Sequence, residues 1–422
     1  MRFYSCLGAF VSLALAGAAG AQEQGLELKD LVAEALRNNP EILASQKRYE
    51  AARQRPSQAA SLPDPTLSLG YSANGNPLPG TGLGTQPTSN IGFSFTQEFP
   101  YPGKLRLRGE ISSKEADAEL AQYTLVERNV ILRLTQAFYR LQHTYPAQEV
   151  LDRNHALLET LLRIIEARYA AGQGSQQEAF KTQTELSVLE TKRIQLERER
   201  RTREAEINSL LNRPAGTAVG QPVEPHVHEI AMTLDEIKAR GLDAAPELRR
   251  DQKMVERSEL SLNLARKEVY PDYALTGGYY YMGGMPPMYQ VRADIKLPLY
   301  FGRKQHAGVA EQWQTLAEAR HAYAAAGQSI GFRIEDAYLA AQSSYQLLNL
   351  YLNTVIPQAH LALQSSLTAY QTGTADFLSV FTNHIMVVDY EMNYHEEMLN
   401  FHLAVSRLEE LTGLDLTKEG QR

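Results

Sequence analysis

Three histidines near the C-terminal end are the side chains best suited to bind a metal ion. They are His384, His395 and His402. A metal site on a helix needs closely paired ligands, such as two histidines four residues apart with a cysteine or carboxylate beside them. His395 and His402 are seven residues apart, on the same helical face as Met392 and Leu399. This spacing favours polar packing or exposure to a channel, and we expect neither a bound metal nor a cofactor.

The remaining sequence does not have the motifs of common enzymes. It contains no glycine-rich phosphate loop, no nucleophile elbow and no closely paired histidine motif. The net charge of −7 does not favour nucleic-acid binding, which requires a basic surface. The mixed charges of residues 192–206 are typical of a solvated helix face. We therefore expect a protein that is not an enzyme and binds no nucleic acid.

The N-terminal residues 1–21 are typical of a secretory signal peptide. Arg2 supplies a positive charge, residues 7–16 form a short apolar core, and residues 19–21 form a cleavage site of small residues. A membrane-spanning helix needs about 20 apolar residues, and no segment reaches that length. The only cysteine, Cys6, lies in this signal, so we expect a mature chain without disulfide bonds.

The chain contains an internal repeat. Three pairs of segments match in the same order at offsets of 201, 199 and 208 residues: 169–172 with 370–373, 101–104 with 300–303, and 63–64 with 271–272. Each copy has the pattern of a helix, two strands and a long helical hairpin. The resulting division is a first repeat (22–213), a proline-rich linker (214–230), a second repeat (231–415) and a C-terminal tail (416–422).

The helical segments predict long rods that pack as coiled coils. A helix over 303–370 would be about 100 Å long, which fits a tube or stalk and no compact domain. Pro146 and Pro357 fall inside these rods and should bend or break them. The heptad positions are Val309, Trp313, Leu316, Tyr323, Ile330, Ile334, Ala337, Ala341, Leu348, Tyr351 and Val355, then Leu378, Phe381, Ile385, Val388, Met392 and Leu399.

Between the helices, short segments alternate apolar and polar residues, which predicts strands with one face of each kind. Such strands suit a barrel with lipid outside and water inside, although a soluble sheet packed on a helix gives the same pattern. A long loop (74–90) joins the first two strands and a short one (283–287) the last two. The predicted strands are 65–73, 90–98, 273–282 and 288–297, and the polar side chains expected to face a lumen include Gln290, Arg292, Asp294 and Lys296.

Four strands are too few to close a barrel, because about eight is the smallest useful number. Unpaired strand edges are not tolerated in lipid. The chain must therefore combine with identical copies if the strands enter a membrane. Three copies would contribute about twelve strands, an even number wide enough for an aqueous lumen. The expected fold is mainly α with a small β part: a coiled-coil helical barrel joined to a transmembrane β-barrel.

Several motifs, in this order, make the chain similar to the TolC-like outer-membrane efflux protein family. They are an opening helix that ends in an Asn-Pro break, the segment that leaves the second strand, two hairpin tips, and the end of the first repeat. The resemblance covers nearly all of the mature sequence. The segments that carry it are 31–41, 97–104, 167–175, 210–213 and 369–376.

The resemblance implies a homotrimer with its β-barrel in outer-membrane lipid and its helical barrel in the periplasm. It also implies that the tips dock on a periplasmic adaptor (membrane fusion) protein and an inner-membrane pump of RND type. Segment 97–104 is most similar to members that serve heavy-metal pumps, which points to metal cations as substrates. The residues implied at the adaptor contact are Tyr169, Gly172, Gly174, Ser175, Tyr370 and Gly373.

Similar proteins often carry carboxylates just past the second tip, where three copies form a charged constriction. The matching positions here are Ser379 and Thr382, with Asp376 one turn earlier. A ring of three Asp376 carboxylates could concentrate cations. An equally good interpretation is that Asp376 caps the helix that begins at Phe377.

Two other functions fit parts of the sequence. A channel of the same family could serve drug efflux or type I secretion, because the pump usually selects the substrate. A soluble periplasmic coiled-coil adaptor would also be exported, rod-shaped and free of cysteine. An adaptor typically has one hairpin between compact β domains, whereas this sequence predicts two hairpins and two strand pairs.

Overall fold

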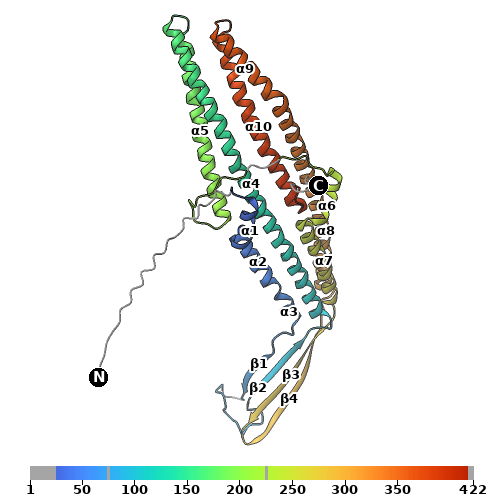
Figure 1. The fold of residues 1–422 in the computed structure, drawn as a ribbon. Helices are drawn as coiled ribbons and strands as arrows, with labels where there is room; N and C mark the ends of the chain where they lie inside the picture. The colour runs from blue at the N-terminus through green and yellow to red at the C-terminus, as the bar shows by residue number, and fades with distance from the viewer. Residues whose placement is uncertain (1–24, 74–76, 224–226, 417–422) are drawn as a thin grey trace, which may run out of the picture.

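The computed structural model describes residues 25–73, 77–223 and 227–416. The predicted signal peptide and nearly all of the predicted tail lie outside these residues. Two long helical hairpins extend in one direction and a small sheet in the other (Figure 1). The elements are α1 (Leu28–Asn38), α2 (Pro40–Ala52), α3 (Arg55–Ala60), β1 (Thr66–Ser72), β2 (Asn90–Phe99), α4 (Lys104–Ala170), α5 (Gln176–Leu210), α6 (Leu234–Ala244), α7 (Pro246–Lys267), β3 (Asp272–Met282), β4 (Met285–Lys296), α8 (Lys304–Leu350), the π-helical turn η1 (Tyr351–Val355), α9 (Ile356–Gln371) and α10 (Phe377–Thr412).

The Asn-Pro break between α1 and α2 is a helix cap that also joins two elements. The Asn39 side chain accepts hydrogen bonds from the backbone N–H groups of Glu41 and Ile42. Its amide donates to the backbone oxygen of Leu210, 2.8 Å away at the end of α5. Pro40 follows at the first helical position, where its missing N–H costs nothing. One buried side chain thus fixes the start of α2 against the end of the first hairpin.

The first hairpin is built on α4, whose 67 residues span about 100 Å. Pro146 does not break this helix. Its neighbour Ala147 is fully buried, so packing along α4 compensates for the one missing hydrogen bond. The second hairpin is less regular, because the π-helical turn η1 separates α8 from α9. Pro357 follows directly, in the first turn of α9, where proline is tolerated.

The heptad prediction is right for most of α8 and only partly right for α10, where Val388 is buried as predicted. The buried face of α8 contains Ile330 and Ile334, as expected, although Trp313 at its start is 56% exposed. In α10 the predicted Leu378 is 54% exposed, and the buried face runs one position earlier, from Phe377. Apolar residues occupy two adjacent faces of α10, so their spacing alone could not distinguish the inner face. That inner face contains Phe377, Val380, His384, Val387 and Glu391.

The four strands form one antiparallel sheet in the order β1-β2-β3-β4. Strands β2 and β3 pair in the middle, from Ile91 opposite Tyr281 to Phe99 opposite Tyr273, and so join the two predicted repeats. The expected 283–287 loop is shorter in the structure, because β4 begins at Met285 after a two-residue glycine turn. Gly283 has a φ of +72°, which suits this tight turn. Strands β1 and β4 remain as the two edges.

Apolar side chains form several separate clusters along the rods in place of one compact core. One cluster lies between α1, α4 and α5, around Leu134 and Ile207. A second lies near the tips and contains side chains of α4, α5, α9 and α10, including Ile165 and Tyr370. This distribution is what long packed helices require. None of the described helices combines the length and apolarity that crossing a membrane demands.

Candidate functional site

One face of the sheet is apolar and uncovered. Leu69 is 79% exposed and Val291 83% exposed, although both side chains belong to regular strands. Within the described residues no helix lies over the sheet (Figure 1). This observation disfavours the alternative of a soluble sheet packed on a helix, because the face has no apolar partner among the described residues. The exposed side chains of the face are Leu67, Leu69, Tyr71, Ile91, Phe93, Phe95, Tyr273, Leu275, Tyr281, Tyr289, Val291 and Ile295.

The opposite face of the sheet is polar and hydrogen-bonded. The Arg292 guanidinium donates to the Asp294 carboxylate over 2.9 Å. The Tyr280 hydroxyl donates to the side-chain oxygen of Gln290 over 2.9 Å. Lys296 continues this row two residues beyond Asp294, since alternate residues of a strand share a face. The four predicted lumen residues thus lie on one face of β4.

The first hairpin tip is a short turn between α4 and α5. Gly172 has a φ of +73°, and its N–H donates to the backbone oxygen of Tyr169 over 2.9 Å. Ser175 caps α5 by accepting a hydrogen bond from the N–H of Gln177. A Cβ on Gly174 would lie 3.2 Å from the backbone nitrogen of Tyr169, so the turn is tight there. Glycine and serine therefore serve this turn, and the ring of Tyr169 stays exposed.

The second tip repeats this geometry between α9 and α10. Gly373 has a φ of +79°, and its N–H donates to the backbone oxygen of Tyr370. The Asp376 carboxylate accepts hydrogen bonds from the N–H and the hydroxyl of Ser379. These bonds hold the pKa of Asp376 below its usual value. Asp376 is thus a helix cap with an exposed, charged carboxylate, and Ser379 and Thr382 are exposed beside it.

The model of the outer membrane efflux protein family matches residues 31–213 and 240–414. The chain belongs to the outer membrane efflux protein family. No curated protein sequence matches it. The efflux protein is therefore located in the outer membrane, as the sequence motifs indicated, and its family points to transport in place of catalysis.

Solved structures of outer-membrane channels have the same fold as this efflux protein. VceC from Vibrio cholerae has a TM-score of 0.77 at 17% identity, covering 91% of this chain and 96% of that chain. CusC has a TM-score of 0.74 at 14% identity, covering 91% of both chains. CmeC from Campylobacter jejuni has a TM-score of 0.75 at 14% identity, covering 93% of this chain and 88% of that chain. The predicted fold class, mainly α with a small β part, is confirmed.

In the efflux protein an interaction between Arg168 and Tyr370 holds the two tips together. The Arg168 guanidinium donates to the backbone oxygen of Tyr370 and lies 4.4 Å from the centre of its ring. The Tyr370 hydroxyl donates to the Glu178 carboxylate over 2.8 Å. Burial and this hydrogen bond raise the pKa of Tyr370 to about 12, so the hydroxyl stays protonated. The side chains of three helices thus meet where the hairpins end.

The repeat makes Tyr169 and Tyr370 equivalent in sequence, but the structure separates them. Tyr169 is 52% exposed and Tyr370 only 2% exposed. Sequence reasoning also missed Arg168 as a partner of Tyr370. A signal was present, because the repeat counterpart of Arg168 is Ala369, which has no charge. Differences between the two copies therefore indicate where an interaction occurs only once.

The histidines of α10 pack as neutral aromatic side chains. His384 and His402 are buried, and none of their ring nitrogens has a hydrogen-bond partner in the described residues. The His402 ring stacks on Tyr139 with 4.4 Å between centres. Burial lowers the pKa of His384, His395 and His402 to about 4 each. Across the described chain, no three potential ligands lie close enough to bind a metal ion.

We expect His402→Phe to reduce the sensitivity of the protein to acid. An unfolded histidine binds a proton near pH 6.5, whereas His402 in the fold does so only near pH 4. The unfolded state therefore gains protons first as the pH falls from 6.5 to 4, and stability decreases over that window. The substitution should remove roughly 3 kcal/mol of this decrease. Denaturant unfolding in detergent at pH 7.5 and pH 4.5 measures the loss of unfolding free energy in the variant and in the unmodified protein.

The control for this prediction is His321→Phe. His321 is exposed on α8, so its replacement should leave the pH dependence unchanged. Equal losses of stability on acidification in His402→Phe and in the unmodified protein would contradict the assignment of acid sensitivity to this ring.

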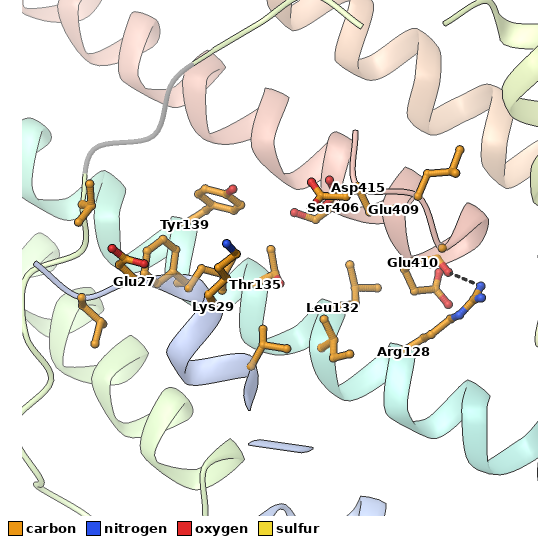
Figure 2. Close-up of a pocket in the computed structure, with 18 residues that line it drawn as sticks. Glu27, Lys29, Arg128, Leu132, Thr135, Tyr139, Ser406, Glu409, Glu410 and Asp415 are labelled. Atoms are coloured by element: carbon orange, nitrogen blue, oxygen red, sulfur yellow. Dashed lines mark hydrogen bonds between the residues drawn. The ribbon is translucent and has the colours of Figure 1, made fainter. Parts of the chain in front are cut away.

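A groove of about 710 Å³ lies where α1, α4 and the end of α10 meet (Figure 2). At one end the Arg128 guanidinium donates to the backbone oxygen of Glu410 over 3.2 Å. Burial lowers the pKa of Arg128 and raises the pKa of the Glu410 carboxyl. Glu27, Lys29 and Tyr139 line other parts of the groove. The groove lies between the two predicted repeats, away from the tips and the sheet.

Proposed function

We propose that this efflux protein is one protomer of a homotrimeric exit duct. The observation that supports this most strongly is a sheet with one exposed apolar face, one polar face and two unpaired edges. Lipid excludes unpaired backbone groups, so the edges must pair with neighbouring copies. Three copies would place about twelve strands around an aqueous lumen, with Gln290, Arg292, Asp294 and Lys296 facing water.

The helical hairpins form the periplasmic part of the proposed duct. Both tips lie at the end of the molecule opposite the sheet (Figure 1). Tyr169, Gly172, Gly174 and Ser175 at the first tip and Gly373 at the second would contact a periplasmic adaptor protein. Because Gly172 and Gly373 have open space around them, a partner can approach the backbone closely at these two positions. An inner-membrane pump of RND type would deliver the substrate through this adaptor.

Metal cations are the substrates that we propose first. Segment 97–104 is similar to members of the family that serve heavy-metal pumps, and an exposed carboxylate, Asp376, lies beside the second tip. Drug efflux and type I secretion remain alternatives within the same family. The soluble adaptor is disfavoured by the family match and by the apolar face of the sheet.

Deletion of the gene, followed by a panel of metal and drug sensitivities, tests the function. We expect the deletion strain to become sensitive to one or more metal cations and to recover on complementation. Sensitivity to drugs alone would favour the alternative substrate class. Recovery of the protein in the soluble periplasm, without loss of resistance to any compound, would contradict the proposed duct.

Asp376→Asn should lower the cation selectivity of the channel. Asparagine caps helices as well as aspartate, so the variant loses the charge and keeps the cap. A charge 4 Å from an ion in water contributes about 1 kcal/mol, so we expect about a five-fold change in permeability ratio for each carboxylate that comes this close to the ion. Reversal potentials in planar bilayers measure it, with Asp376→Glu as the control that retains the charge. Unchanged selectivity in Asp376→Asn would place Asp376 away from the pore.

A further inference from the structure

A buried lysine joins the two repeats at the base of the sheet. Lys104, at the start of α4, is 1% exposed. Its ammonium group lies 2.9 Å from the Asp272 carboxylate and 3.1 Å from the Glu268 carboxylate. The same Asp272 oxygen accepts a hydrogen bond from the backbone N–H of Tyr101 over 2.8 Å. We call Tyr101, Lys104 and Asp272 the root clamp.

The root clamp lies where strands β2 and β3 meet, one from each predicted repeat. Tyr101 and Lys104 follow β2, the second strand of the first repeat, and Asp272 begins β3, the first strand of the second repeat. Just above it, Phe99 pairs with Tyr273 at the end of the β2–β3 ladder. The clamp therefore fixes the end of this ladder, and with it the register of the two strands.

The residues of the clamp recur at the two free edges of the sheet. Asp64, before β1, matches Asp272, and the segment Tyr300 to Arg303, after β4, matches Tyr101 to Lys104. Asp64 and Arg303 are exposed, and neither has an ion-pair partner in the described part of one chain. One edge of the sheet thus carries an acid, Asp64, and the other a base, Arg303. Their counterparts Asp272 and Lys104 pair with each other inside one chain, whereas Asp64 and Arg303 do not.

We propose that Asp64 of one copy pairs with Arg303 of the next copy, repeating the root clamp at each subunit boundary. This inference rests on the homotrimer proposed above and specifies how its strands meet. The apolar contact of the clamp also has a counterpart. Tyr101 stacks on Tyr270 with 4.5 Å between centres. The corresponding residue of the second repeat, Tyr300, is 79% exposed in one chain and would be covered by the neighbouring copy.

The correspondence between the two repeats also predicts the register between β4 and the β1 of the next copy. Pro100 after β2 corresponds to Pro298 after β4, with Leu299 as one inserted residue before Tyr300. Transferring the β2–β3 register through this alignment places Ala293 opposite Leu69. Apolar side chains then oppose apolar ones along the whole boundary, and polar ones oppose polar ones or glycine. The remaining pairs are Val291 with Tyr71, Ile295 with Leu67, Arg292 with Gly70, Asp294 with Ser68 and Lys296 with Thr66.

Cysteine cross-linking in outer membranes tests this register. The only native cysteine lies in the predicted signal peptide, so the mature background should be free of thiols. The double variant Leu69→Cys, Ala293→Cys should oxidise to a covalent trimer on non-reducing gels. The slipped double variant Leu67→Cys, Val291→Cys should give at most a tenth of that yield, because its thiols would be four residues out of register. Equal yields, or a higher yield from the slipped variant, would overturn the proposal.

Two further variants separate a wrong register from a wrong assembly. Phe93→Cys, Tyr279→Cys forms a pair inside one chain, so it should cross-link without producing trimers and shows that the sheet is folded. If this pair oxidises while neither boundary pair does and the protein runs as a monomer, the trimer itself is excluded. If chemical cross-linking still captures a trimer but only the slipped pair oxidises, the proposed register is wrong and the proposed trimeric duct is retained.

A charge exchange tests the ion pair. Asp64→Arg and Arg303→Asp should each lower the fraction of heat-resistant trimer several-fold, and the two changes together should restore most of it. Additive losses in the double variant would overturn the pairing of these two residues.

Discussion

The Gly373→Pro variant is expected to reach the outer membrane as abundantly as the unmodified protein and to lose all measurable efflux. Gly373 has a φ of +79°, whereas proline fixes φ near −65°. The N–H of Gly373 donates to the backbone oxygen of Tyr370, and proline has no N–H. The turn would therefore have to change its backbone path, at a cost of about 3 kcal/mol or more. The sheet and its root clamp lie at the other end of the molecule and should be unaffected (Figure 1).

Gly373→Asn is the matched control. In one chain a side chain at this position would meet nothing within 4 Å, so the turn itself can accept one. Asparagine adopts positive φ more readily than other side chains, so this variant should keep the turn and retain clearly more efflux than Gly373→Pro. Any remaining loss would come from the added side chain at the proposed adaptor contact. Resistance assays and quantification of the protein in outer membranes measure both variants. Normal resistance conferred by Gly373→Pro would show that residues 372–376 are not the working tip.

Lys104→Met should lower the free energy of unfolding by about 3 kcal/mol. The ammonium group is buried, and its loss would leave the carboxylates of Glu268 and Asp272 close together without their cation. Breaking a buried ion pair costs about 3–5 kcal/mol, and the partial exposure of both carboxylates places this case at the lower limit. Methionine nearly fills the volume of the lysine stem, so a cavity contributes little. Denaturant unfolding in detergent measures the loss.

Arg106→Met on the same helix controls for this effect. Arg106 forms an ion pair with Glu110, and both side chains are exposed to solvent. Exposed pairs contribute about 0–1 kcal/mol, so this variant should unfold almost as the unmodified protein does. Equal losses from the two substitutions would contradict the special role of the buried clamp.

Local periodicity was enough to predict much of this protein. Alternation located all four strands to within three residues, because a strand with one apolar and one polar face leaves a period of two in the sequence. The repeat located both tips, since a turn between antiparallel rods needs a residue with positive φ, and both Gly172 and Gly373 have it. The motifs around these glycines, together with those at 31–41, 97–104 and 210–213, indicated the family.

Only the tertiary structure decided which of two equivalent side chains makes a contact. Tyr370 is buried against Arg168 while Tyr169 is exposed, and His402 packs on a ring that lies 263 positions earlier in the sequence. The inner face of α10 also depended on which neighbour the helix meets. Periodicity records the faces of an element, because each face repeats along the chain. It does not record the partner, because a contact between distant residues leaves no regular spacing in the sequence.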